Sequence, residues 1–169
     1  ISFLKPYQKL RVLTYLNPDR DPLGAGYQII QSKIAIGSGG LFGKGFLKGT
    51  QSYLEFLPEK HTDFIFTLFS EEFGFLGSVF LLIIYAIIIY RIIKIGSVSR
   101  SYFAKLFCYS FGASIFVCIM INMSMVLGML PIVGSPLPIM SYGGSSMLAT
   151  MIGLGIVMSA KIHSHQAIA

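Results

Sequence analysis

The residues best suited to chemistry in this chain are three acids at the start of a long apolar run. These acids are Asp63, Glu71 and Glu72, and after Glu72 no charged residue occurs until Arg91. The run 73–90 has about the length of a segment that crosses the hydrocarbon core of a bilayer. We therefore expect these acids near a membrane surface, either as ordinary flanking charges or as groups retained for a function.

Composition places the chain among polytopic membrane proteins. Of its 169 residues, 54% are hydrophobic and only 12% are charged, which lies outside the usual range of soluble domains. All seven acids fall between Asp19 and Glu72, whereas basic residues continue to Lys161. A net charge of +6 with this distribution is typical of membrane topology rather than of nucleic-acid binding. The start at Ile1 indicates a piece of a longer protein.

Hydrophobic patterning predicts an all-α membrane protein of one domain, with a large outer loop at residues 1–63. Within that loop, residues 27–36 have helical spacing and end at Gly37, which predicts a short amphipathic helix at the interface. Three spanning helices are expected at about 64–93, 102–126 and 144–161, with an outer loop at 130–143. The link after the first span is short and basic, so it and the tail after Lys161 are expected in the cytoplasm. Asn122, an amide inside a span, is expected to form a helix-to-helix hydrogen bond.

A glycine-rich segment at 37–45 invites comparison with phosphate-binding loops. The comparison fails, because a Walker A loop needs glycine where Ser38 stands and a hydroxyl where Gly45 stands. A flexible hinge that uses positive φ is the preferred interpretation. Lys44 and Lys48 remain candidates for approaching an anionic headgroup, since backbone without side chains allows close contact.

The second outer loop, which leads into the last span, is rich in proline and glycine. Its three prolines exclude a regular helix, and the absence of a Gly-x-Ser-x-Gly elbow argues against a serine nucleophile. Backbone of this kind at membrane depth must be surrounded by protein or line a water-filled cavity. The loop is therefore predicted to form a wall of the site, through Pro136, Ser141, Gly143 and Gly144.

Several ordered motifs together resemble the SEDS family of cell-wall polymerases. They are DPLGAGYQ (21–28), GTQS (49–52), LPEKHTDFIF (57–66), EEFG (71–74) and PLPIMSYGGSS (136–146). The segments 32–40 and 49–56 are most similar to the rod-shape branch rather than to the division branch. The resemblance covers nearly the whole chain and corresponds to the C-terminal part of a bundle of about ten helices, so we expect the piece to be inactive alone.

The resemblance implies a peptidoglycan glycosyltransferase that polymerises lipid II into glycan strands for cell elongation and rod shape. Such enzymes act at the outer face of the bacterial cytoplasmic membrane, together with a class B penicillin-binding protein that crosslinks the glycan. Asp63 matches the catalytic aspartate of the family, and Glu71 matches a second acid of functional importance on the following helix. We expect both to be catalytic, with Glu71 as the electrostatic or metal-binding partner of Asp63, about two helical turns further along a continuous helix. Glu59, Lys60 and His61 fall in the same motif and are assigned to substrate binding.

Glycosyl transfer fits these residue types. A base must take the proton of the acceptor hydroxyl as it attacks the anomeric carbon, and a carboxylate in a partly dehydrated cleft is suited to that task, which makes Asp63 the candidate base. The leaving group is a lipid pyrophosphate, so cations are needed opposite it. Lys44, Lys48, Lys60 or a divalent ion bridged by carboxylates would meet that need, and the sequence does not choose between them. No organic cofactor is expected.

Two other classes of function remain alternatives: a lipid II flippase and a non-catalytic scaffold of an elongation complex. A flippase needs polar groups along its spans, where this chain has little beyond Asn122. A scaffold needs no acid at the outer end, where this chain has Asp63.

Overall fold

The computed structural model describes residues 25–46, 48–49 and 62–164, and this part of the chain is helical. It contains α2 (Ala25–Gly39), α4 (Ile65–Val98), α5 (Tyr102–Val126) and α6 (Gly144–Ile162). The last three are long and apolar enough to cross a membrane. The predicted all-α membrane fold is confirmed.

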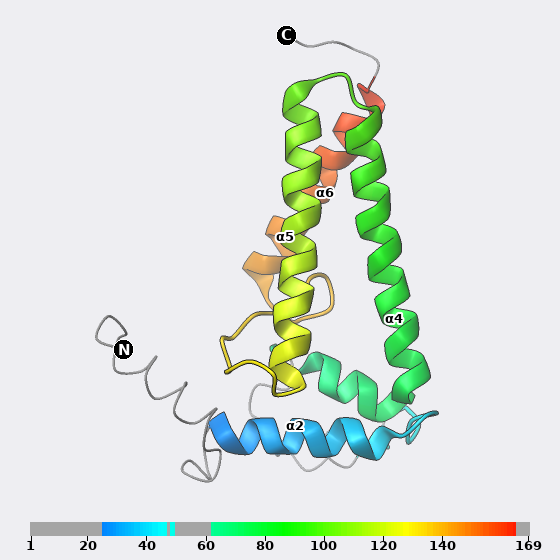
Figure 1. Ribbon diagram of the computed structural model, residues 1–169, viewed down its shortest axis with the longest axis vertical. Coiled ribbons are helices and arrows are strands. Elements are labelled where there is room, and N and C mark those ends of the chain that lie inside the picture. The colour runs from blue at the N-terminus through cyan, green and yellow to red at the C-terminus, as the bar shows by residue number, and fades with distance from the viewer. Residues whose placement is uncertain (1–24, 47, 50–61, 165–169) are drawn as a thin grey trace, which may run out of the picture.

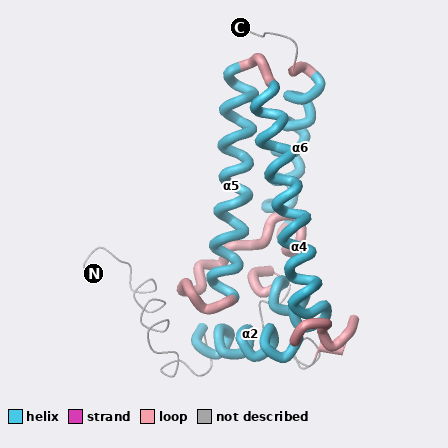
Figure 2. Tube along the Cα trace, turned by 45° about the vertical axis from the view of Figure 1, so that its right-hand side comes forward, coloured by secondary structure: helices cyan, strands magenta, loops and turns pink. Residues whose placement is uncertain are grey.

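The three long helices form a bundle, and α2 lies across one of its ends. Figure 1 shows α4 and α5 running in opposite directions, with α6 behind them. The link between α4 and α5 and the end of α6 lie together at the end opposite α2, and the rotated view in Figure 2 shows the same arrangement. We call the end that carries α2 the site end and the opposite end the basic end.

The first long helix differs from the continuous span predicted at 64–93. It extends to Val98 and is broken at Gly74, whose φ of 69° and ψ of −164° lie in a region that is essentially restricted to glycine. Residues 65–73 turn across the bundle axis beside α2, and only the part after Gly74 rises along the bundle (Figure 1). That part is still roughly 36 Å long, which is enough to cross a membrane.

The glycine-rich loop fastens both sides of this break. The amides of Lys44 and Gly45 donate to the carbonyls of Glu71 and Glu72 at 3.0 Å each. On the other side, the amides of Phe75 and Leu76 donate to the carbonyls of Gly40 and Leu41 at 2.9 and 3.2 Å. Backbone groups that a broken helix would leave without partners are satisfied in this way.

The loop is therefore a fixed part of the fold rather than the flexible hinge that was expected. Gly40, Gly43 and Gly45 do adopt positive φ, as the hinge interpretation required. A Cβ at Gly43 would overlap the carbonyl oxygen of Glu72, so the two backbones meet where side chains have no room. The amides of Gly40, Gly43, Lys44 and Gly45 donate to protein carbonyls, so these four are not available to bind a phosphate.

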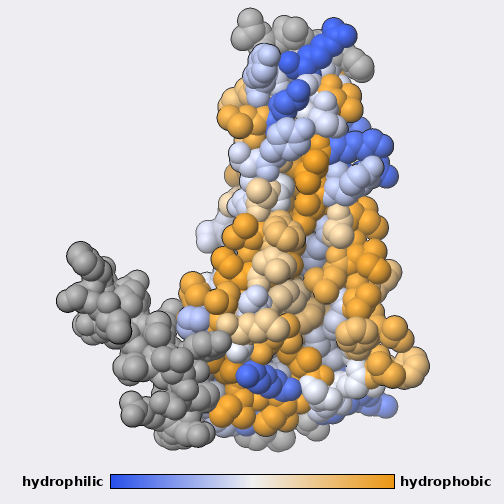
Figure 3. Space-filling view, viewed as in Figure 1, coloured by the Kyte–Doolittle hydropathy of each residue, from blue (hydrophilic) through white to orange (hydrophobic). Residues whose placement is uncertain are grey.

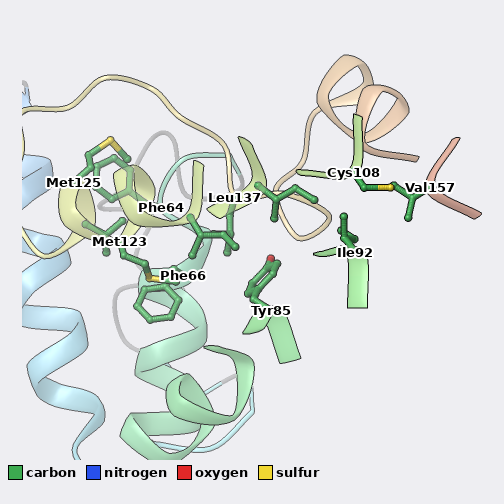
Figure 4. Packing of buried hydrophobic residues seen from close by; sticks show 12 residues of the cluster. Phe64, Phe66, Tyr85, Ile92, Cys108, Met123, Met125, Leu137 and Val157 are labelled. Carbon is green, nitrogen blue, oxygen red and sulfur yellow. The ribbon is translucent and has the colours of Figure 1, made fainter. Parts of the chain in front are cut away.

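Buried apolar side chains connect the site end with the middle of the bundle. Figure 4 shows Phe64 beside Met123 and Met125 of α5, with Leu137 of the second outer loop between this group and Tyr85 of α4. Burial of one such side chain stabilises the fold by about 1.5–3 kcal/mol relative to its exposure to water. The packing fixes the residue next to Asp63.

The outer surface of the bundle is largely apolar. Figure 3 shows hydrophobic residues over much of the visible face, with strongly hydrophilic residues mainly toward the two ends. Exposed Phe80, Ile87, Phe103 and Ile152 are among the many large apolar side chains on the three long helices. Such a surface is typical of helices in contact with lipid or with further membrane helices.

Candidate functional site

Asp63 lies in a short segment whose backbone is held from two other parts of the chain. The side-chain amide of Asn122 on α5 donates to the Asp63 carbonyl at 2.9 Å. The hydroxyl of Ser141 donates to the carbonyl of the preceding residue, Thr62. Phe64, directly after Asp63, is fully buried. The aspartate is thus fixed on both sides, which is what a catalytic group needs for a defined position.

The second outer loop comes close to the Asp63 side chain. At Gly134, which has a φ of 77°, a Cβ would lie 3.3 Å from Oδ2 of Asp63. The same Asn122 amide that holds the Asp63 backbone also donates to the carbonyl of Ser135 at 2.7 Å. One buried amide therefore joins the acid and the loop.

This loop enters the bundle instead of covering it from outside. The hydroxyl of Tyr85 donates to the carbonyl of Pro138 at 2.6 Å, and Tyr85 is roughly 16 Å along α4 from the break at Gly74. Leu137 is almost completely buried. In Figures 1 and 2 the chain accordingly turns back into the bundle before α6 begins. Irregular backbone at such a depth is tolerated because protein surrounds it.

A hollow of about 680 Å³ lies between this loop and the starts of two helices. Its lining consists of Ile65 on α4, loop and helix-start residues 139–144, and Met147 on α6. Ile139 has a φ of 70°, an unfavourable backbone conformation for a β-branched residue. Strain of this kind is concentrated at functional sites, where the surrounding structure maintains it.

Glu71 occupies a different position, at the break in α4. It is fully buried, and its Oε1 lies 2.8 Å from the Nζ of Lys44, whose side chain is 28% exposed. Because the helix turns across the bundle before Gly74, Glu71 is displaced along the site end and not two turns further into the membrane, as the continuous helix had implied. The ion pair joins the glycine-rich loop to the helix break, beside the backbone hydrogen bonds described above.

The predicted site residues thus separate into groups. Ser141, Gly143 and Gly144 line the hollow. Asp63 is not in the lining, but its segment adjoins it through the bond from Ser141 to the carbonyl of Thr62. Pro136 lies in the same loop between the anchored Ser135 and the buried Leu137. Lys44 and Glu71 form the ion pair, and Lys48 is exposed near the glycine-rich loop. Glu59, Lys60 and His61 lie outside the described residues.

Two residues of the site were not selected from the sequence. Asn122 was expected to join two helices and instead bonds to the backbone of Asp63 and of Ser135; its position as an amide in an apolar span was the available signal. Tyr85 holds the loop at depth, but a tyrosine in an apolar run carried no signal of that contact.

The described residues give little support to a divalent ion bound at Glu71. No group of three acid, histidine or cysteine side chains that could hold a metal ion occurs within them. The ammonium of Lys44 already supplies the positive charge next to Glu71. We therefore assign the local neutralisation of Glu71 to lysine and derive no step through a metal.

The three apolar helices and the re-entrant loop define the chain as an integral membrane protein with a hollow at one end of its bundle. The family model for FtsW, RodA and SpoVE, described as "cell cycle protein", matches residues 1–166. The chain belongs to this family.

Named relatives agree with the family match. The chain is 53% identical over 160 residues to the peptidoglycan glycosyltransferase MrdB of Escherichia coli K12, covering 95% of this chain and 43% of that protein. It is 45% identical to the peptidoglycan glycosyltransferase RodA of Treponema pallidum, covering 94% of this chain and 37% of that protein. The chain therefore spans about two fifths of the length of these relatives.

A solved structure shows the same fold. It belongs to a peptidoglycan synthase complex that coordinates polymerization and crosslinking, and its TM-score with this chain is 0.76 at 34% sequence identity. The match covers 96% of this chain and 44% of the solved one.

Proposed function

We propose that this chain is part of a peptidoglycan glycosyltransferase that polymerises lipid II into glycan strands for cell elongation. The observation that carries the proposal is the position of Asp63. Its backbone is held by Asn122 and its carboxylate lies beside Gly134, in the loop that goes on to line the hollow. The similarity to relatives named as peptidoglycan glycosyltransferases supports the reaction class.

In the proposed reaction Asp63 acts as the general base. It accepts the proton of the acceptor hydroxyl while that oxygen forms a bond to the anomeric carbon of the donor sugar. The bond between that carbon and the lipid pyrophosphate breaks, and the pyrophosphate leaves with the electron pair. Lys48 and Lys60 are the proposed cations for this charge, because Lys44 is engaged with Glu71.

Glu71 has a positioning role in this proposal. Its contact is with the ammonium of Lys44, which belongs to the loop that closes the helix break. A stable break determines the direction of residues 65–73 and hence the place of the Asp63 segment that precedes them. We accordingly propose that Glu71 acts through the fold and not by proton transfer.

The proposed setting is the bacterial cytoplasmic membrane, with the site end at the outer face. The acid-free, basic loop between α4 and α5 lies at the other end of the bundle, and the positive-inside rule assigns it to the cytoplasm. The solved relative comes from a complex that coordinates polymerization and crosslinking. We propose a class B penicillin-binding protein as the crosslinking partner of the whole protein.

Synthesis in detergent micelles separates the polymerase from the alternatives. Micelles have no second face, so a flippase makes no glycan there, and a scaffold makes none in any setting. We expect the purified full-length protein to form glycan chains from purified lipid II in micelles. The absence of polymer in this assay, with the crosslinking partner added as well, would contradict the proposal.

The hollow is tested by filling it. An added Cβ at Gly144 meets no atom within 4 Å, whereas one at Gly143 would press on the hydroxyl of Ser146. Gly144→Val should therefore lower glycan synthesis at least tenfold while membrane abundance stays normal. Gly143→Val, which also disturbs the start of α6, should reduce both. Normal synthesis by Gly144→Val would remove the hollow from the proposed site.

A further inference from the structure

A second hollow lies at the basic end of the bundle, away from Asp63. It has a volume of about 410 Å³ and lies between the end of α4 and the end of α6. Its lining residues are Arg91, Lys94, Ile95, Val98, Lys161 and Ser164. Half of them are cations, and they come from two helices that are far apart in the sequence.

Helical spacing explains how α4 presents its part of the wall. Arg91, Ile95 and Val98 follow one another at intervals of four and three residues, and Lys94 is three residues after Arg91, so all lie on one face. The end of α6 is tied to the same place, because the amide of Arg100 donates to the carbonyl of Ser164 at 3.2 Å. The two helix ends are thus fixed relative to each other.

Within the described residues, the three cations have no acidic counterpart nearby. Arg91, Lys94 and Lys161 are exposed, and none forms an ion pair within the described part of the chain. The sequence contains no Asp or Glu after Glu72. Like charges that share a hollow repel one another, and an anion bound between them removes that cost.

The remaining wall selects the kind of anion. Ile95 and Val98 give the hollow an apolar side. A cationic pocket with an apolar wall at the end of membrane helices matches a phosphate headgroup with acyl chains attached. A soluble phosphate would use only the cations.

We propose that this hollow binds the headgroup phosphate of an anionic phospholipid of the cytoplasmic leaflet. Lys94 and Lys161 contact the phosphate from the two helices, and the acyl chains lie along Ile95 and Val98. The inference rests on the membrane orientation proposed above. It does not depend on the chemistry at Asp63, so glycan synthesis and lipid binding are tested separately.

The test uses the purified full-length protein in a non-ionic detergent and three soluble probes. They are dioctanoyl phosphatidylglycerol, dioctanoyl phosphatidylcholine and glycerol 3-phosphate, and microscale thermophoresis measures their binding. We expect saturable binding of the phosphatidylglycerol, and at least tenfold weaker binding of the other two. The zwitterionic lipid tests the charge, and glycerol phosphate tests the acyl chains.

Two variants with equal loss of charge localise the site. Lys94→Gln/Lys161→Gln removes one cation from each wall, whereas Arg100→Gln/Lys105→Gln removes two cations at the same end that do not line the hollow. A cation near an anionic lipid surface is worth about a factor of five in binding, so the first variant should bind phosphatidylglycerol about 30-fold more weakly. The second variant keeps all three cations that line the hollow, so it should change the binding of phosphatidylglycerol less than about threefold.

Three results would overturn the proposal: equal weakening in both variants, equally tight binding of phosphatidylcholine, or equally tight binding of glycerol phosphate. Equal weakening in both variants would mean that the cations serve only membrane topology. Equal binding of phosphatidylcholine would mean a non-specific lipid surface, and equal binding of glycerol phosphate would mean a site for soluble anions. If the double variant does not fold, Lys161→Gln is compared with Lys105→Gln, and the same ranking is expected with about a fivefold loss for Lys161→Gln.

Discussion

The ion pair between Lys44 and Glu71 gives the sharpest test of how the helix break is held. Lys44→Met removes the cation and leaves a carboxylate that is 0% exposed, whereas Glu71→Gln removes the acid and leaves an ammonium that is 28% exposed. The two substitutions break the same contact, but they leave different groups behind. We therefore expect unequal losses of stability.

The magnitudes follow from burial. Removal of one partner from a fully buried pair costs about 3–5 kcal/mol, because the other charge stays buried without compensation. Since Lys44 is partly exposed, we expect the lower end of this range or slightly less, about 2–3 kcal/mol, for Lys44→Met. Glu71→Gln should cost about 1–2 kcal/mol, because the lysine can turn toward water. The double variant should lose less than the sum, by about 1–2 kcal/mol.

Cys108 provides the assay. Its side chain is fully buried where the second turn of α5 packs against the last turns of α4, so a thiol-reactive fluorescent maleimide reacts with it only on unfolding. Thermal and denaturant unfolding of the full-length protein can be followed in this way, with Cys108→Ala as the background. Lys48→Met is the matched control, since Lys48 follows the same loop and is exposed. It should cost less than about 0.5 kcal/mol.

Two outcomes would refute this account of the break. One is a loss for Lys44→Met no larger than that for Lys48→Met. The other is strict additivity in the double variant, because residues in direct contact should show a coupling energy.

Three further predictions test the helix break, the amide that joins acid and loop, and the topology. Gly74→Ala should destabilise the protein by about 1–3 kcal/mol in the same thiol assay, because alanine is strained at this φ and its Cβ would overlap the loop backbone. The control is Gly37→Ala in α2, where a Cβ has open space, and it should be neutral or stabilising. Equal effects of the two substitutions would contradict the account of the break. Asn122→Ala leaves two part-buried carbonyls without this donor, at about 0.5–1.5 kcal/mol each, and should lower glycan synthesis more than membrane abundance. Loss of both in proportion would make Asn122 a folding residue only. A cysteine at Ser97, which is exposed in the last turn of α4, should resist an impermeant maleimide in intact cells and react after lysis; labelling of intact cells would reverse the topology.

The fold could be predicted from the sequence wherever it depends on apolar length. The three spans follow from runs of hydrophobic residues and α2 follows from helical spacing, and the described bounds differ by only a few residues at most ends. The break in α4 was not predicted, because a glycine inside an apolar run is compatible with a continuous helix. Gly74 breaks the helix because the loop around Gly43 supplies backbone partners from about thirty residues earlier, and that pairing has no local signature.

The candidate site was predicted in its residue types but not in its connections. Asp63 and the loop that contains Ser141 were selected for their chemistry, and the structure brings them to one place. Glu71 was expected to assist Asp63, yet its ion-pair partner is Lys44, which lies on another segment. Asn122 was assigned to helix packing because its acceptors, two backbone carbonyls of irregular segments, become neighbours only in the folded chain.

The most direct test of the proposed function is the rate of glycan-chain formation by the purified full-length protein and its Asp63→Asn form. The substitution keeps the shape of the side chain and removes its basicity, so the backbone bond from Asn122 to residue 63 should persist. We expect the rate to fall by about 10² to 10⁴, as for loss of a general base, with lipid II binding and thermal stability close to those of the parent protein. A near-normal rate at normal abundance would contradict the assignment of Asp63 as the base.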